Sequence, residues 1–294
     1  MTRPLRLATR GSALAQWQAR NVVDLLRGVD PGVEAELVVI ETTGDVRTDV
    51  PLHAIGGQGV FVKEVQQAVL DGRADVAVHS AKDLPSGEPP DGLVLAAVPA
   101  RGDARDALVG ATLAGLAPGA RVATGAVRRR AQLAALRPDL VFDDLRGNID
   151  TRLTKVPDGG AIVVAQAALE RLGRTDRVAE VLSVEQMVPQ VGQGALAVEC
   201  RRDDERTRDR LAKIESPIDR GFVELERAFL AELGGGCDLP VGAYAHLDDD
   251  GQPVFRSFLS GPAGIWRDRR HGPLSDHGWV VATAREAAAA VGLR

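Results

Sequence analysis

The stretch at residues 4–28, PLRLATRGSALAQWQARNVVDLLRG, contains in one run the structural unit from which most of the chain is predicted to be built. A short apolar strand leads into a turn at Gly11 and Ser12, and an amphipathic helix follows. Ser12 is suited to cap that helix, because a serine hydroxyl can accept a hydrogen bond from the free N–H groups of the first turn. The apolar face of the helix is predicted to include Leu14, Trp17, Val22 and Leu25. A strand followed by a covering helix indicates an α/β fold.

The same alternation of strand and helix recurs along the chain. VEAELVVIETTGD (33–45) and ADVAVHSAKDLP (74–85) are typical of strands, and a glycine loop leads into a helix in GGQGVFVKEVQQAVLDG (56–72). Strand-then-helix units follow at residues 120–138, 139–156 and 160–173, and QGALAVEC (193–200) is a later apolar strand. Repeated units of this kind favour mostly parallel sheets.

Changes in this pattern mark the predicted domain boundaries. We expect a first α/β domain at residues 1–98 and 199–216 and a second at 99–198, with the chain crossing between them twice. Residues 217–294 differ, because a helix, alternating strand-like runs and an Ala-rich final helix indicate a small α+β domain. The fold class is therefore two α/β domains with a small C-terminal α+β domain.

Composition excludes several classes of protein. The 294 residues carry a formal net charge of −5, which argues against a generally basic nucleic-acid-binding surface. No apolar run approaches the length of a membrane-spanning helix. Arg3, Arg6 and Arg10 interrupt the N-terminal apolar residues, so no secretory signal is predicted and a cytoplasmic location is expected. Two cysteines are too few for a disulfide framework, and no Cys/His cluster has zinc spacing, so no metal site is predicted.

The predicted strand ends are rich in arginine. Of 36 basic residues only four are lysine, and arginines gather in or near the tips at residues 9–12, 124–129 and 145–148. Ligands of α/β sheets bind at the carboxyl ends of the strands, where helix N-termini also favour anions. Any single arginine here can equally be solvated or paired with a neighbouring acid. As a group they predict a ligand with several carboxylates or phosphates.

The tip HSAKD (79–83) places an acid among these cations. Asp83 is either a structural cap or partner of Lys82, or a carboxylate held in a cleft to stabilise a developing positive charge. His79 is expected to be a structural residue at the strand end. The GGQG segment lacks the GK[ST] ending of a nucleotide-binding P-loop. It is predicted to be a mobile lid, formed by Gly56, Gly57, Gln58 and Gly59 with Phe61 behind them.

The stretch LGGGCDLPVG (233–242) places Cys237 behind three glycines. A metal role is excluded because no histidine or second cysteine is near, and a disulfide is not expected in the cytoplasm. A packing thiol, a nucleophile and an attachment point for another group stay open. Cys200, on an apolar strand, is predicted to be a packing cysteine.

These motifs occur together in one known family. LATRGSALA, GVFVKE, DVAVHSAKDLP, RRRAQL, LRGNIDTRL, VGQGALAVEC and GGGCDLPVGAY follow one another across residues 5 to about 245. The chain thereby resembles hydroxymethylbilane synthase, also called porphobilinogen deaminase. The resemblance implies two domains like those of type II periplasmic binding proteins, and a third that carries the cysteine loop. It also implies a monomer that joins four porphobilinogen molecules with loss of ammonia and releases hydroxymethylbilane.

The resemblance assigns roles to particular residues. Cys237 matches the cysteine that forms a thioether to a dipyrromethane cofactor, and Asp83 matches the carboxylate that stabilises positive charge on pyrrole nitrogen. Positions that bind the cofactor are matched by Lys82, Asp83, Thr124, Arg128, Arg129, Arg146 and Gly147. Positions that bind the substrate are matched by Arg10, Ser12, Gln18, Arg146, Arg152 and Arg171.

The chain departs from the family pattern in two places. The frequent G-T-S-S block reads Ala123-Thr124-Gly125-Ala126, so two hydroxyls are missing, and Ala54 and Gln58 stand where the lid often carries lysines. The alternative interpretation is a non-catalytic, two-lobed protein that binds an anion or solute. The third domain and the glycine-flanked cysteine argue against that alternative.

Overall fold

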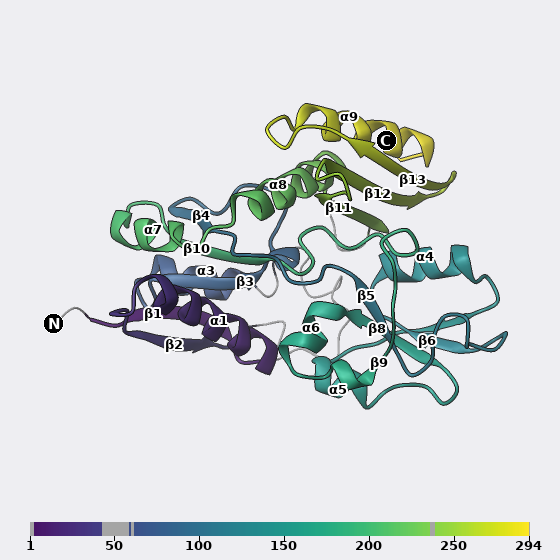
Figure 1. The fold of residues 1–294 in the computed structure, drawn as a ribbon, viewed down its shortest axis with the longest axis horizontal. Coiled ribbons are helices and arrows are strands. Elements are labelled where there is room, and N and C mark those ends of the chain that lie inside the picture. Colours follow the sequence, from purple (N-terminus) through teal and green to yellow (C-terminus); the bar gives the residue numbers. More distant parts are fainter. Residues whose placement is uncertain (1–2, 43–58, 60–61, 236–238, 294) are drawn as a thin grey trace. The chain divides into compact units, whose positions relative to one another are not determined.

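The computed structural model describes residues 3–42, 59, 62–235 and 239–293. The chain forms two compact units (Figure 1). Unit 1 comprises Met1–Gly102 and Ala195–Gly221, and unit 2 comprises Asp103–Gly194 and Phe222–Arg294. The three-domain division with its boundaries stays a prediction.

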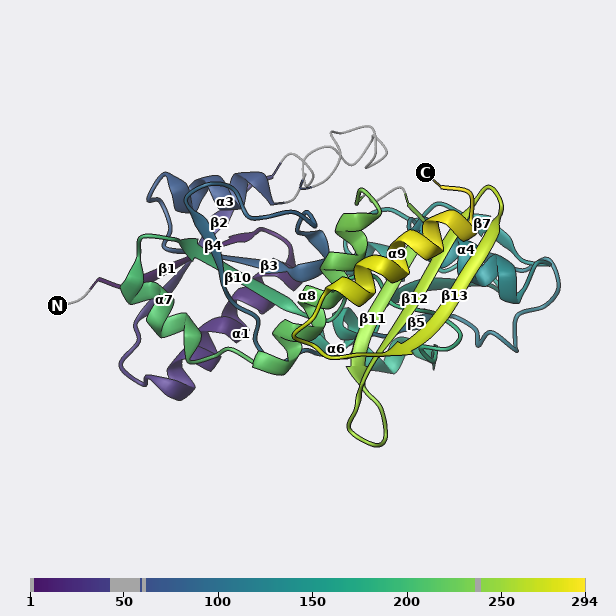
Figure 2. The same ribbon diagram turned by 90° about the horizontal axis from the view of Figure 1, so that it is seen from above.

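Unit 1 is built on a five-stranded sheet in the order β2-β1-β3-β10-β4. Its strands are β1 (Leu5–Arg10), β2 (Ala35–Ile40), β3 (Val76–Ser80), β4 (Leu93–Ala97) and β10 (Leu196–Arg201). Helices α1 (Ala13–Val29) and α7 (Glu205–Ala212) contribute to the apolar cluster on one face, and α3 (Lys63–Leu70) covers the other (Figure 2). Both faces are therefore buried, which explains why these strands read as almost continuous apolar runs.

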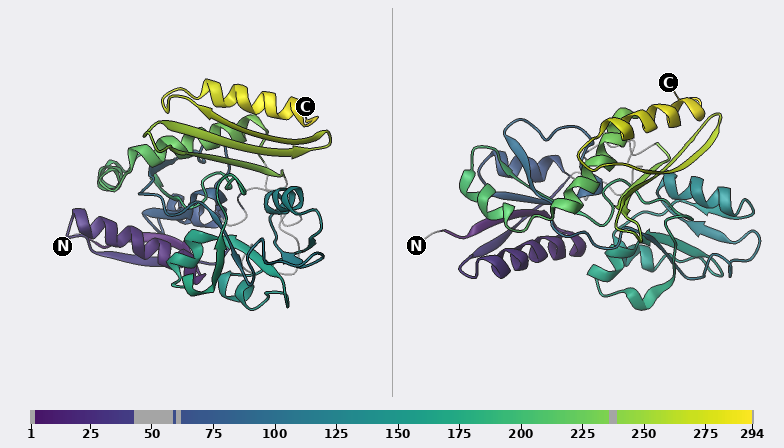
Figure 3. Two further views of the ribbon diagram at one scale, coloured as in Figure 1. Left: turned by 45° about the vertical axis from the view of Figure 1, so that its right-hand side comes forward. Right: turned by 45° about the horizontal axis from the view of Figure 1, so that its top comes forward.

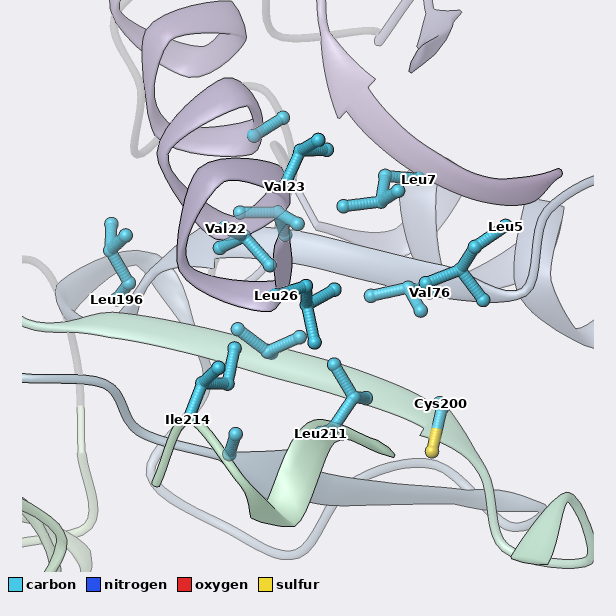
Figure 4. Close-up of a cluster of buried hydrophobic side chains, with 14 of the residues drawn as sticks. Leu5, Leu7, Val22, Val23, Leu26, Val76, Leu196, Cys200, Leu211 and Ile214 are labelled. Carbon is cyan, nitrogen blue, oxygen red and sulfur yellow. The ribbon is translucent and has the colours of Figure 1, made fainter. Parts of the chain in front are cut away.

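Alternating side chains of β3 supply both faces of this core. Val76 and Val78 join the cluster beneath α1, and Ala77 joins the one beneath α3. Figure 4 shows the first cluster, in which Cys200 lies among aliphatic side chains. The prediction of a packing cysteine at this position is confirmed.

Unit 2 repeats this arrangement with the order β7-β6-β8-β5-β9. Its strands are β5 (Asp106–Val109), β6 (Arg121–Ala123), β7 (Val141–Asp143), β8 (Ala161–Ala165) and β9 (Val178–Val181). Helix α4 (Val127–Leu136) packs on one face, and α5 (Ile149–Leu153) and α6 (Gln166–Arg171) pack on the other. The predicted strand-then-helix units at residues 120–173 are confirmed.

The expectation of mostly parallel sheets is wrong, because half of the pairings in each sheet are antiparallel. In unit 1, β1 is parallel to β2 and β3, whereas β10 is antiparallel to β3 and β4. In unit 2, β5 occupies the equivalent fourth place and is antiparallel to β8 and β9. Each of these strands enters its sheet just after the chain has crossed from the other unit. It does not arrive through a strand–helix–strand crossover, which is what makes neighbouring strands parallel.

The remaining part of unit 2 is a smaller sheet between two helices. Strands β11 (Val241–Leu247), β12 (Pro253–Gly261) and β13 (Gly264–His271) are antiparallel in that order. Helix α9 (Gly278–Ala290) lies along this sheet, as Figure 3 shows, and α8 (Pro217–Glu232) adds Phe229 to the shared core. The predicted α+β character is confirmed. The sequence analysis missed β13, whose exposed face alternates charged side chains with a half-buried one.

The apolar face of α1 differs from its prediction. Val22 is buried as expected, but Leu25 is 37% exposed. The buried face consists of Gln18, Ala19, Val22, Val23 and Leu26. It is rotated because the buried amide of Gln18 takes a place that periodicity alone assigns to an apolar side chain. Ser12 caps the helix as predicted and accepts a hydrogen bond from the Ala15 N–H at 3.3 Å.

Candidate functional site

The acidic tip of unit 1 begins where β3 ends. A single 3₁₀ turn, Ala81–Asp83, follows directly on the strand and carries Lys82 and Asp83 half-buried. The N–H of Ala81 donates to the carbonyl of Ala195 at 3.0 Å, which ties the turn to the residue before β10. The sequence pattern therefore locates Asp83 correctly, at the carboxyl end of an inner strand.

Gln18 supports this tip from the α1 face of the sheet. Its amide is 3% exposed and donates to the Ser80 hydroxyl at 2.8 Å. The predicted substrate residue thus has a partner inside the protein, on the last residue of β3. Gln18 is placed to hold the strand end that leads to Asp83.

The β1 tip lies at the same edge of the sheet. β1 pairs in parallel with β3, so Arg10 at its carboxyl end is on the side of the 81–83 turn. The end of the GGQG segment also lies at this edge, since a Cβ on Gly59 would lie 3.4 Å from Pro85 Cγ. Gly59 has φ +84°, and its carbonyl accepts the N–H of Val62 at 2.9 Å, one residue before α3 begins.

The arginine-rich tip of unit 2 is organised around one buried acid. Asp106, on β5, is fully buried and accepts from Arg128 Nη2 at 2.8 Å and from Arg129 Nε at 2.9 Å. Gln193 donates to the same carboxylate at 3.0 Å. The guanidiniums also donate to main-chain carbonyls, Arg128 to Val188 at 2.6 Å and Arg129 to Val163 at 2.9 Å.

The charges of this cluster do not balance. Burial acts to raise the pKa of Asp106, but the neighbouring positive charges of Arg128 and Arg129 outweigh it and lower the pKa to about 2. The carboxylate is therefore ionised at neutral pH, and it offsets one of two buried positive charges. Arg128 Nε is buried without a hydrogen-bond partner among the described residues. The start of α4 thus keeps an excess positive charge, added to the N–H groups of a helix start.

Two glycines let the neighbouring tip approach this helix start. A Cβ on Gly125 would lie 2.6 Å from the Leu145 carbonyl oxygen, so the two loops meet where Gly125 has no side chain. Gly147 has φ +113°, and a Cβ there would lie 2.8 Å from Thr151 Cγ2. The Thr124 hydroxyl, which the family pattern retains, accepts the N–H of Ala126 at 3.2 Å. A serine at position 125 would need the loop at Leu145 to move.

The other predicted arginines of unit 2 are held by main-chain carbonyls. Arg152 Nε donates to the Gly147 carbonyl at 2.7 Å, beside the half-buried Arg146. Arg171 Nη2 donates to the Gly194 carbonyl at 2.6 Å. Burial lowers the pKa of Arg171 to about 10, which leaves it charged at neutral pH. A guanidinium carries several N–H donors, more than one carbonyl oxygen can accept.

Each unit thus gathers its own part of the predicted site. Unit 1 holds Arg10, Ser12, Gln18, Gly59, Lys82 and Asp83, and unit 2 holds Thr124, Arg128, Arg129, Arg146, Gly147, Arg152 and Arg171. Cys237 and the lid residues Gly56, Gly57, Gln58 and Phe61 lie outside the described residues. Within the described ranges, no three His, Cys, Asp or Glu side chains are placed to share a metal ion. In the same ranges, no helix combines the length and apolarity needed to cross a bilayer.

Sequence reasoning missed Asp106, the residue that organises the arginines. Its signal is an acid at the first position of an otherwise apolar strand, DALV, in a chain with paired arginines elsewhere. A charge in such a place must find a partner, because an isolated buried carboxylate is very costly. The sequence alone does not say which arginines supply it.

Comparison with known proteins gives the context of these sites. Among solved structures, the chain resembles reduced OxyR from N. meningitidis at 13% identity and a TM-score of 0.39, over 73% of this chain and 95% of that one.

Much higher similarity is found in sequence. The curated porphobilinogen deaminase of Roseiflexus sp. (strain RS-1) is 48% identical over 94% of this chain and 92% of its own length. That of Nitratidesulfovibrio vulgaris is 48% identical over 90% of this chain and 85% of its own. Two family models match, the dipyrromethane cofactor binding domain of porphobilinogen deaminase at residues 5–209 and its C-terminal domain at 222–264. The chain therefore belongs to the porphobilinogen deaminase family, the hydroxymethylbilane synthases, which are transferases that use a dipyrromethane cofactor.

Proposed function

We propose that the chain joins four porphobilinogen molecules head to tail, with Asp83 as its catalytic carboxylate and Cys237 as the attachment point of dipyrromethane. The buried cluster of Arg128, Arg129 and Asp106 supports this proposal most directly, because its two guanidiniums share one carboxylate. The remaining positive charge favours an anionic ligand at the start of α4.

The donors of unit 2 fit a ligand that carries several carboxylates. Each porphobilinogen unit has an acetate and a propionate, and a guanidinium fork binds a planar carboxylate better than an ammonium does. Arg128, Arg129 and the first N–H groups of α4 would hold carboxylates of dipyrromethane, with Lys82, Thr124, Arg146 and Gly147 as its other contacts. When bound, dipyrromethane supplies the primer to which pyrrole units are added.

Asp83 would perform the chemical role in unit 1. Loss of ammonia from porphobilinogen, and the attack that follows, place positive charge on pyrrole nitrogen. A carboxylate fixed beside that nitrogen stabilises the charge as it forms, and a half-buried position limits screening by water. The 3₁₀ turn fixed to the end of β3 gives Asp83 the fixed geometry that this role requires.

The substrate carboxylates would bind to Arg10, Arg146, Arg152 and Arg171. Ser12 and Gln18 already have partners in the protein, the Ala15 N–H and the Ser80 hydroxyl. We therefore assign them a supporting part, in which they fix the α1 start and the β3 end beside the substrate. The segment formed by Gly56, Gly57, Gln58, Gly59 and Phe61 is proposed to close over the substrate.

Intact-mass measurement of the purified protein tests the covalent primer. The wild type is expected to carry the extra mass of two linked pyrrole units, and Cys237→Ser is expected to lack it. Cys200→Ser is the matched control, since Cys200 is buried and burial raises the pKa of its thiol to about 11, which leaves it unreactive. Wild-type protein that stays unmodified after incubation with porphobilinogen would favour the non-catalytic binding protein instead.

The chain is also proposed to work as a cytoplasmic monomer without nucleic-acid or membrane partners. Its net charge of −5 supports the absence of a nucleic-acid partner. Light scattering coupled to size-exclusion chromatography would give a mass near 31.1 kDa for a monomer, and a mass of twice that value would contradict it.

A further inference from the structure

A second buried carboxylate lies inside the sheet of unit 1. Glu199, on β10, is 1% exposed. Gln66 Nε2, on α3, donates to both of its oxygens, at 3.1 and 2.9 Å. His79 Nε2, on β3, lies 3.1 Å from Oε2 and is itself buried. Three elements therefore meet at one acid that the sequence pattern treats as part of an apolar strand.

Such a group is not explained by stability alone. Taking a carboxylate and an imidazole out of water is costly, and apolar side chains of similar volume often do as well or better in such a place. Other inward positions of this strand carry apolar or small side chains, such as Val198 and Cys200. A buried polar unit retained here therefore indicates a need for a defined geometry.

The partners of Glu199 show which geometry is held. His79 is the last but one residue of β3, and the 3₁₀ turn with Lys82 and Asp83 begins two residues later. On the opposite face of the sheet, Ser80 is held by Gln18. The last two residues of β3 are thus anchored to opposite faces by buried side-chain contacts. Gln66 extends the α3-side contact to the helix that follows the GGQG segment.

We propose that Glu199 is a positioning residue for the catalytic turn. With Gln66 and His79 it forms one buried polar unit that joins α3, β3 and β10 and holds Asp83 in its working position. This inference rests on the proposed role of Asp83. A displacement of about 1 Å at a reacting group can cost as much as 100-fold in rate, so loss of this support is expected to be visible in turnover.

Glu199→Gln is the direct test, because it keeps the size and hydrogen-bonding capacity of the side chain and removes its charge. We expect kcat to fall by about 10-fold or more, with KM changed less than about threefold and the two-pyrrole mass retained. Gln66→Met removes only the amide donors and should lower kcat in the same direction by a smaller factor. If Glu199→Gln does not fold, Gln66→Met alone decides, and an unchanged kcat there overturns the proposal.

Glu226→Gln provides the matched control in unit 2. Glu226 is also fully buried in a polar contact, accepting the N–H groups of Gly192 at 2.7 Å and Ala245 at 2.9 Å. We expect this variant to lower the melting temperature without the selective loss of kcat. A Glu199→Gln enzyme that loses only thermal stability, with kcat within about twofold of wild type, overturns the positioning role. Failure of the proposed function would appear differently, as a wild type without primer or turnover.

Discussion

The sheets of the two units have the same strand order and differ in how each balances one buried acid. Both acids lie on the fourth strand, the one antiparallel to its neighbours, Glu199 on β10 and Asp106 on β5. Glu199 faces one imidazole and one amide, whereas Asp106 faces two guanidiniums and an amide. One topology thus supports a tip that presents an acid in unit 1 and a helix start with excess positive charge in unit 2. The chemistry follows from the partners of the buried acid, not from the fold.

The largest expected effect comes from removing the acid that unit 1 presents. Asp83→Ala should lower turnover by roughly 100-fold or more, because a fixed charge that stabilises the transition state is lost. The fold and the two-pyrrole mass should persist, since unit 2 holds most of the proposed cofactor contacts. Steady-state kinetics and intact mass measure both. Near-normal turnover would remove the proposed distinction between a catalytic tip and a binding tip.

The corresponding change in unit 2 should act on loading more than on chemistry. Arg129→Ala breaks contacts to Asp106 and Val163 inside the protein, at an expected cost of about 3 kcal/mol in the free energy of unfolding. The fraction of molecules that carry the primer mass should fall clearly. Arg208→Ala, on the exposed surface of α7, serves as control and should change neither property. Equal and silent results for both variants would contradict the role of the buried cluster.

The smallest effect concerns acid stability. Asp106 has a folded-state pKa of about 2, below an unfolded value near 3.9. A lowered folded pKa means that ionised Asp106 contributes stability above pH about 4, and that this contribution of about 2 kcal/mol is lost as the pH falls toward 2. Denaturant titrations between pH 6 and 2 should therefore show a shallower acid decline for Asp106→Asn than for wild type. The exposed pair of Asp144 and Arg130 gives a control, because Asp144→Asn should leave that decline unchanged.

Much of the architecture was predictable from local pattern. Apolar strands ending in polar tips located Asp83, Arg10 and the start of α4 at the carboxyl ends of their strands, and Ser12 was recognisable as a cap. The antiparallel insertion of β5 and β10 was not predictable, because strand direction depends on where the chain returns from the other unit. The partners of buried charges were also missed. Periodicity marks Gln18, Asp106 and Glu199 only as interruptions in an apolar face, and their partners are distant in sequence, as Gln66 and Glu199 show.

The close approach of Gly125 to Leu145 has a consequence for the history of this chain. Where relatives resemble the G-T-S-S pattern, a side chain occupies the place that Gly125 leaves to the Leu145 carbonyl, 2.6 Å from a Cβ. The two tips are therefore expected to coevolve, with serine tolerated at position 125 only alongside permissive changes in the loop at residues 145–148. Grafting the common motif into this chain alone would then show epistasis: the hydroxyl it restores would be offset by displacement of Arg146.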